Sequence, residues 1–356
     1  MINAILRYLS FVNRNRIKWR RQRKIKAELR GVETKSLKCN PKEVKKVLII
    51  DALYCFGDAL FVNGLLRCLK EHGVIVGIVT FARLKDIYGS VVESDLIFDI
   101  EDQSSYKLIF DQNWDMAVDL CYMFNDRWKY RKNIIMSLMS YTVVCDMTFY
   151  DIPKTIYSEV LDISACKHFG DRMARVAERI IGSKVGTVLP YAPSVEADVN
   201  IKQRYVYVNT VGGTPFRCLS KEQIQQIANE LNGRRIKGLF YCSEDFDLSE
   251  GQYIQRIRPD KFTDCLHLIY KAEAVISPDT SVVHVASAYD KPLLALYCAN
   301  DPEHYGQQMK DVWAPCCAQQ VILIPKNDGA HRVSVSQISE ECLRDGLVKL
   351  FNFIGF

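Results

Sequence analysis

The sequence predicts an α/β protein made of two doubly wound lobes that face each other across a cleft. The chain has 356 residues, which at about 150 residues per domain suggests two domains. Short β-branched segments alternate with amphipathic helical segments, a pattern typical of parallel sheets covered by helices on both faces. The alternation is interrupted once, at 189–203, where two prolines and no clear period indicate a linker.

The first lobe is predicted over residues 45–188. It begins with the buried strand 45–51 (KKVLIID), after which Gly57 and Asp58 open a helix whose apolar residues recur every three or four positions. Further strands are expected at 74–80, 95–100, 116–120 and 141–145, and further helices at 83–88, 106–112 and 165–181.

The second lobe is predicted over residues 204–334, and a closing helix within 335–356. Because ligands bind at the carboxyl ends of the strands in such sheets, the cleft between the lobes is the expected site. The expected strands are 204–209, 236–241, 274–277, 292–297 and 321–324, and the expected helices are 221–231, 263–271 and 280–289.

The first 44 residues form a basic amphipathic extension. Residues 1–46 hold 15 of the 47 basic and 3 of the 42 acidic residues, a local charge of +12, so the remainder carries −7. An apolar strip beside dense positive charge suits the surface of an anionic membrane, although a solvated helix or one packed on the acidic body is the alternative. The strip on one helical face consists of Ile2, Ile5, Leu6, Leu9 and Val12.

The overall composition is that of a soluble globular protein. Hydrophobic residues make up 48% and charged residues 25%, and no apolar run reaches the roughly 18 residues of a membrane-spanning helix. Because the body is acidic, a nucleic-acid-binding surface is not expected. The 13 cysteines include no C-x-x-C pair, so we expect the reduced thiols of a cytoplasmic protein and no metal site.

Three loops carry the residues that favour chemistry, and the first is Ala52–Asp58 (ALYCFGD) after the first strand. Asp58 is either a helix N-cap or, at this end of the sheet, a general base.

The second loop is Asn209–Leu219 (NTVGGTPFRCL), after the first strand of the second lobe. Backbone and hydroxyl donors from Gly212, Gly213 and Thr214, with the fixed charge of Arg217, indicate a phosphate cradle. The alternative is a glycine turn with a surface arginine, since neither GxxxxGK[ST] nor GxGxxG is present.

The third loop is Ser277–His284 (SPDTSVVH), where Asp279, Thr280 and Ser281 open a helix and His284 lies four residues after Thr280, on the same face. A helix N-terminus attracts anions, although a capped helix with a packed histidine is the alternative. Phosphate donors in one lobe and a carboxylate in the other together indicate group transfer from a nucleotide.

These segments resemble glycosyltransferase family 9, the ADP-heptose–lipopolysaccharide heptosyltransferases, over about residues 45–345. The family begins with a strand, a loop ending in Gly-Asp and a helix, here VLIIDALYCFGDALFVNGLLRCL. Much later it has a strand, an Asp-Thr-Gly-x-x-His-type segment and a Lys-Pro strand, here AVISPDTSVVHVASAYDKPLLALY.

The resemblance implies two Rossmann-like lobes of the GT-B type and an inverting, metal-independent transfer of heptose from ADP-heptose to the lipopolysaccharide core. It implies that Asp58 is the base, and that Asp279, Thr280 and His284 contact the donor diphosphate. Arg217 matches a basic residue that the family has just before a Trp-Pro pair. Ser281 stands where the family has glycine, which leaves the donor sugar open.

Other functions remain open at this level. One is a transferase using another nucleotide sugar, and one is a non-catalytic relative that binds a glycolipid or a partner. A dinucleotide-dependent oxidoreductase is disfavoured because GxGxxG is missing near the first strand.

The acceptor is expected to lie on the first lobe. Lipopolysaccharide cores are acidic, so the basic segment 124–132 is a candidate acceptor surface, with a solvated helix face as the alternative. Its basic residues are Arg127, Lys129, Arg131 and Lys132. If the acceptor is membrane-bound, the extension would hold the enzyme at the cytoplasmic face of the inner membrane.

Overall fold

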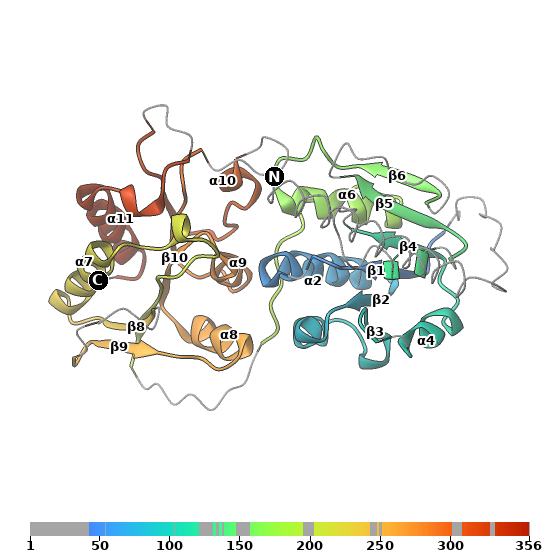
Figure 1. Ribbon diagram of the computed structural model, residues 1–356, viewed down its shortest axis with the longest axis horizontal. Helices are drawn as coiled ribbons and strands as arrows, with labels where there is room; N and C mark the ends of the chain where they lie inside the picture. Colours follow the sequence, from blue (N-terminus) through green and yellow to red (C-terminus); the bar gives the residue numbers. More distant parts are fainter. Residues whose placement is uncertain are drawn as a thin grey trace, which may run out of the picture.

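Two six-stranded parallel sheets, one in each lobe, form the frame of the computed structural model (Figure 1). The prediction of two doubly wound lobes is confirmed. The basic extension lies outside the described residues. These are 43–53, 55–102, 104–120, 131–132, 135–136, 139–146, 157–194, 203–242, 248, 251–300, 308–327 and 332–355.

The sheet of the first lobe has the strand order β3-β2-β1-β4-β5-β6. Strands β2 and β3 are added on one side of β1 and strands β4 to β6 on the other, so the strand order reverses between β1 and β4. Strand β1 is buried over Val47–Ile50, because helices cover both faces of the sheet. The strands are β1 (Lys46–Ile50), β2 (Ile75–Thr80), β3 (Ile97–Asp99), β4 (Met116–Asp119), β5 (Thr142–Asp146) and β6 (Glu159–Asp162). The helices are α2 (Phe56–Glu71), α3 (Lys85–Tyr88), α4 (Ser105–Asp111) and α6 (Phe169–Ile181).

The sheet of the second lobe repeats this arrangement with the order β12-β11-β10-β7-β8-β9, and its reversal lies between β7 and β10. Ligand sites in doubly wound sheets form outside the carboxyl ends of the strands at such reversals. The strands are β7 (Tyr205–Asn209), β8 (Lys237–Tyr241), β9 (Ile254–Ile257), β10 (Ala274–Pro278), β11 (Leu293–Leu296) and β12 (Gln320–Leu323). The helices are α7 (Lys221–Gly233), α8 (Phe262–Lys271), α9 (Ser281–Ala288), α10 (Met309–Val312) and α11 (Glu340–Phe353).

The structure adds two strands that the sequence pattern did not predict, β6 and β9. Each is the outermost strand of its sheet on one side, and in each, two of the four residues are charged or polar. An edge strand that is half exposed lacks the continuous apolar run that marks a central parallel strand. The closing helix also starts later than expected, at Glu340, because the Ser339 side chain caps it by accepting a hydrogen bond from Cys342 N.

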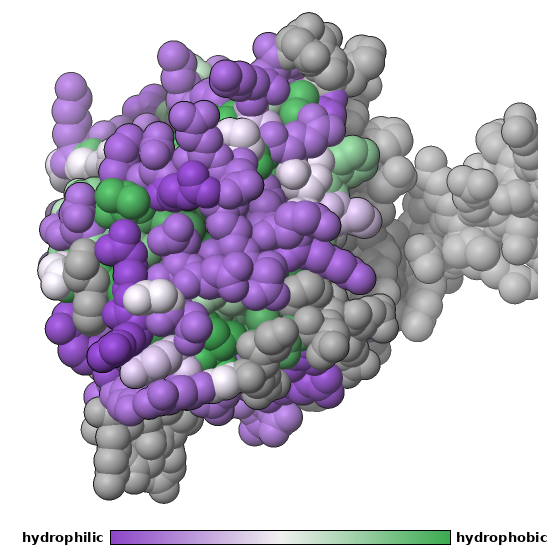
Figure 2. All heavy atoms as spheres, turned by 90° about the vertical axis from the view of Figure 1, so that its left-hand side faces the viewer, coloured by the Kyte–Doolittle hydropathy of each residue, from purple (hydrophilic) through white to green (hydrophobic). Residues whose placement is uncertain are grey.

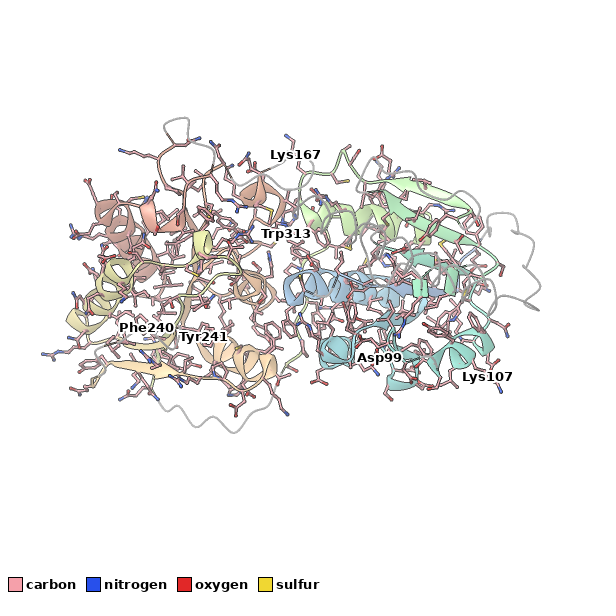
Figure 3. All side chains as sticks on the ribbon, in the orientation of Figure 1. Asp99, Lys107, Lys167, Phe240, Tyr241 and Trp313 are labelled. Carbon is pink, nitrogen blue, oxygen red and sulfur yellow. The ribbon has the colours of Figure 1, made fainter. Side chains whose placement is uncertain are left out.

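The two lobes touch where α2 packs against α9 (Figure 1). An aromatic cluster fills this contact. Phe61 of α2 lies 5.2 Å from the His284 ring of α9, and Phe169 of α6 stacks at 4.3 Å on Trp313 of the second lobe. Figure 3 shows Trp313 in this position between the lobes. The contact therefore joins the lobes at the helix that carries Asp58.

The segment 182–194 leads from the first lobe toward the second across α2. Tyr191 N donates to Leu60 O at 2.9 Å, and the backbone passes so close to Gly64 that a Cβ there would lie 2.0 Å from Leu189 O. Beyond it, Tyr289 of the second lobe donates its hydroxyl to Pro193 O. Because Gly64 has no side chain, the backbone of the connecting segment can pass directly over α2 at this point.

The outer face of the second lobe, with α7 and α11, is mainly hydrophilic (Figure 2). A groove on this face is lined by charged and amide side chains, and none of the loop residues predicted above is among them. No helix in the described part of the chain is long and apolar enough to cross a membrane.

Candidate active site

Asp58 lies in the first turn of α2, as the third residue of the helix. The N-cap is Cys55, whose side chain makes no capping bond, so the interpretation of Asp58 as the N-cap is wrong. The Cys55 thiol hydrogen-bonds the Asp58 carboxylate, and desolvation together with this negative neighbour raises the thiol pKa to about 11. Asp58 itself is only partly buried.

Gly57 brings the start of α2 against the start of α9. A Cβ at this position would lie 3.0 Å from His284 Cδ2 and 3.6 Å from Ser281 Cα. A side chain here would crowd the His284 ring, whereas the Ser281 backbone would be at ordinary contact distance, so the glycine permits the close approach to His284. Gly57, the residue before Asp58 in the sequence, thereby lies against the third predicted loop.

The second and third loops meet through an ion pair. Arg217 Nη1 lies 3.3 Å from Asp279 Oδ2, and both side chains are largely shielded from solvent, 19% and 6% exposed. Gly212 is needed for this loop shape, since a Cβ there would lie 2.4 Å from Arg217 Cβ. Gly213 has open space around it, so it is not required for packing.

Thr280 is the N-cap of α9, and its hydroxyl accepts a hydrogen bond from Val282 N at 3.3 Å. Asn209, at the end of β7, donates to Thr280 Oγ1 at 3.1 Å and to Ser277 Oγ at 3.0 Å. Sequence reasoning did not single out Asn209, although its place at a strand end beside the glycine loop was a usable signal. These bonds fix the N-terminus of α9 to the neighbouring strand, so an anion there would meet a preorganised helix end.

His284 is buried and neutral. Burial, and then the neighbouring His168, lower its pKa to about 3, and its Nδ1 has no hydrogen-bond partner among the described residues. The ring packs among aromatic side chains at the contact between the lobes. His284 therefore does not add positive charge to the site, whereas Arg217 and the N-terminal end of α9 do.

A second aromatic contact joins the lobes beside Asp58. Phe56, the first residue of α2, stacks at 3.9 Å on Phe262, the first residue of α8, and the Arg83 guanidinium lies 4.7 Å from the Phe56 ring centroid. Asp58, Arg217 and the N-terminal end of α9 thus lie in a region bounded by two contacts between the lobes. One is the aromatic cluster around His284, and the other is the stack of Phe56 on Phe262.

The predicted acceptor surface is only partly described. Arg127 and Lys129 lie outside the described residues. Arg131 donates from Nη1 to Ile100 O at 2.8 Å. Lys132 is 1% exposed and pairs with Asp119 at 3.1 Å, so the expectation that it belongs to an exposed basic surface is wrong. A buried ammonium needs a carboxylate partner, and Asp119 at the end of β4 provides it.

Metal-binding geometry is not seen in the described ranges, where no three His, Cys, Asp or Glu side chains cluster suitably. The described cysteines are all free thiols.

Comparisons with known proteins agree with the loops and the fold. The family model described as glycosyltransferase family 9 (heptosyltransferase) matches residues 260–339. The Escherichia coli (strain K12) protein named "Putative lipopolysaccharide heptosyltransferase 4" is 26% identical over 299 residues, covering 78% of this chain and 80% of the relative.

Solved structures show the same fold at low identity. The glycosyl transferase family 9 protein of Veillonella parvula has a TM-score of 0.68 at 12% identity, covering 88% of this chain and 99% of its own. E. coli ADP-heptose lps heptosyltransferase II has a TM-score of 0.67 at 15% identity, covering 87% and 100%. E. coli heptosyltransferase WaaC, solved with ADP, has a TM-score of 0.65 at 13% identity, covering 86% and 99%.

Two parallel-sheet lobes whose Gly-Asp and Pro-Asp-Thr loops approach each other match the GT-B architecture of the heptosyltransferase structures. The region after β9, which contains the Asp-Thr loop, is the part that the family model matches. By the family-model match and the E. coli relative, the chain is a glycosyltransferase similar to family 9, the heptosyltransferases.

Proposed function

We propose that this protein transfers heptose from ADP-heptose to a lipopolysaccharide core acceptor, with inversion at the anomeric carbon and without a metal ion. The observation that carries the proposal is the approach of Gly57, next to Asp58, to Ser281 at the start of α9. The first turn of α2, which carries this carboxylate, thereby approaches the electropositive start of α9 on the other lobe. The names of the heptosyltransferase relatives support the choice of donor.

In the proposed reaction, an acceptor hydroxyl attacks the anomeric carbon of the donor sugar. A new carbon–oxygen bond forms while the bond to the diphosphate breaks on the opposite face, and Asp58 accepts the hydroxyl proton. ADP leaves with the bonding electron pair. The carboxylate and the diphosphate must lie on opposite sides of the sugar, as groups on two facing lobes do.

Charge on the leaving diphosphate would be stabilised by Arg217 and by the N-terminal amides of α9. One preorganised donor of this kind can contribute about 3 kcal/mol to the transition state. Arg217 is held beside Asp279, and the start of α9 is fixed by Asn209. Both groups are therefore in position before the nucleotide sugar binds. Together they would do the work for which many other transferases use a divalent ion.

The donor and acceptor are tested by incubating the protein with ADP-heptose and a panel of truncated core acceptors, and measuring product mass. We expect one heptose to be added to one acceptor, and little transfer from UDP-hexoses or GDP-hexoses. Transfer from one of those sugars but not from ADP-heptose would contradict the proposed donor. ADP binding with no transfer to any acceptor would favour the non-catalytic alternative.

We further propose that residues 1–40 hold the enzyme at the cytoplasmic face of the inner membrane. The charge of +12 within residues 1–46 would be attracted to anionic lipid, whereas the body at −7 would be repelled. Attachment would also raise the local concentration of a membrane-bound acceptor.

Liposome co-sedimentation measures this attachment. The full chain is expected to sediment with anionic vesicles and to be partly released by salt, because exposed charges are screened within about 8 Å at physiological ionic strength. A shortened chain that begins at Pro41 should stay in solution. Equal sedimentation of both chains, or equal binding to neutral and anionic vesicles, would show that the extension has another role.

A further inference from the structure

Asp51 is a buried carboxyl group beneath the loop that carries Asp58. It follows β1 directly and is 0% exposed. Its Oδ1 accepts a hydrogen bond from Leu53 N at 3.1 Å, and its Oδ2 accepts one from the Tyr88 hydroxyl at 2.5 Å. Tyr88 is the last residue of α3 and is also 0% exposed. The first turn of the loop is therefore tied to both β1 and α3.

The neighbouring strand end carries a matching arrangement. Asp119 ends β4, which pairs with β1 in a register that sets Ile50 opposite Asp119. Lys132 Nζ lies 3.1 Å from Asp119 Oδ2, and the Tyr157 hydroxyl donates to the same oxygen at 2.7 Å. Lys132 thus pairs with Asp119, and its charge also acts on the buried Asp51 without a direct contact.

Burying the Asp51 carboxyl does not by itself stabilise the folded protein. Burial raises the pKa of Asp51, and the hydrogen bonds from Tyr88 and Leu53, followed by the charge of Lys132, offset only part of that effect. An apolar residue would extend the apolar strand β1 without burying a carboxyl group. The cost of burying the Asp51 carboxyl is explained if its hydrogen bonds with Leu53 and Tyr88 set the direction of the chain after β1.

The loop that leaves Asp51 ends in the contact between the lobes. Cys55 hydrogen-bonds Asp58, Gly57 lies close against His284 and Ser281, and Phe56 stacks on Phe262. A change in the direction of the chain at Leu53 would move all three. A displacement of about 1 Å at a reacting group can lower a rate by roughly two orders of magnitude.

We propose that Asp51 and Tyr88 are positioning residues that set the Asp58 carboxylate against the donor. This inference rests on the proposed role of Asp58 as the base. Neither side chain reaches the donor loops of the second lobe, so the expected loss is in kcat rather than in donor binding.

The test compares Tyr88→Phe with Tyr141→Phe. Tyr141 is a matched control because its hydroxyl also donates to a carboxylate of the first lobe, Glu159, at 2.8 Å, but it lies just before β5 at the opposite, amino end of the sheet. We expect Tyr88→Phe to lower kcat about tenfold, with the ADP Kd and the donor KM within twofold of the native values. Tyr141→Phe should leave kcat within twofold, at a similar loss of Tm.

Asp51→Asn and Asp51→Ala provide a second comparison. Asparagine keeps an oxygen that can accept from Leu53 N, so Asp51→Asn should retain several-fold more activity than Asp51→Ala. Native kcat in Tyr88→Phe, or an equal loss of kcat in Tyr141→Phe at equal loss of Tm, would overturn the inference. So would a loss of ADP affinity as large as the loss of kcat. The proposed base fails separately, if Asp58→Asn is fully active.

Discussion

Replacing Asp58 with asparagine is expected to lower kcat by about two orders of magnitude or more while leaving ADP affinity unchanged. Asparagine has nearly the same shape and keeps a polar group in the first turn of α2, but it cannot accept the proton of the acceptor hydroxyl. ADP is expected to bind to the second lobe, so titration calorimetry should give the native Kd. Steady-state rates at saturating donor and acceptor measure the change in kcat.

The chain offers a closely matched control. Helix α6 also begins with Phe-Gly-Asp, at Phe169–Asp171, so Asp171 has the same place in its helix as Asp58. Asp171 accepts a hydrogen bond from Thr187 Oγ1 at 2.6 Å and therefore has a structural partner. Asp171→Asn should keep native kcat. If Asp58→Asn keeps near-native kcat, or if both variants lose activity equally, Asp58 is not the base.

Replacing Arg217 with alanine is expected to weaken ADP binding by about 1.5–3 kcal/mol, the usual contribution of a hydrogen bond to a charged group. This corresponds to roughly a tenfold to 150-fold rise in Kd. The structure adds a second reason, because removing Arg217 leaves the shielded Asp279 carboxylate unpaired close to the bound diphosphate. Calorimetric titration with ADP measures the effect.

Arg234→Ala serves as the control for that measurement. Arg234 belongs to the same lobe but lies beside Glu230 at the end of α7, and its guanidinium is 4.8 Å from the Phe351 ring centroid. Its loss should leave the ADP Kd within twofold. Activity of the native protein should also survive EDTA. Native ADP affinity in Arg217→Ala, or an absolute requirement for Mg²⁺, would contradict the proposed donor site.

The central strands of both sheets could be predicted because each is a short, continuous apolar run, as in β1 and β10. The edge strands β6 and β9 could not, since exposure lets polar residues enter them. The three loops were also predictable, because glycine, aspartate and threonine at strand ends have specific conformational and hydrogen-bonding reasons to be there.

The surroundings of the site residues were not predictable, because they depend on contacts between distant segments. Asp58 could not be distinguished from an N-cap without the helix start, and Lys132 looked like part of a basic surface until its pairing with Asp119 was known. The repeated Phe-Gly-Asp shows the same limit. Only the approach of Gly57 to Ser281 distinguishes the first copy as part of the site.

A crystal structure of the protein with ADP bound would locate the diphosphate directly. We expect the diphosphate to lie within hydrogen-bonding distance of Arg217 and of the backbone amides at the start of α9. We also expect Asp58 to face the β-phosphate across a space large enough for one sugar. A diphosphate bound on the first lobe, in the groove between α7 and α11, or through a metal ion held by side chains, would contradict this expectation.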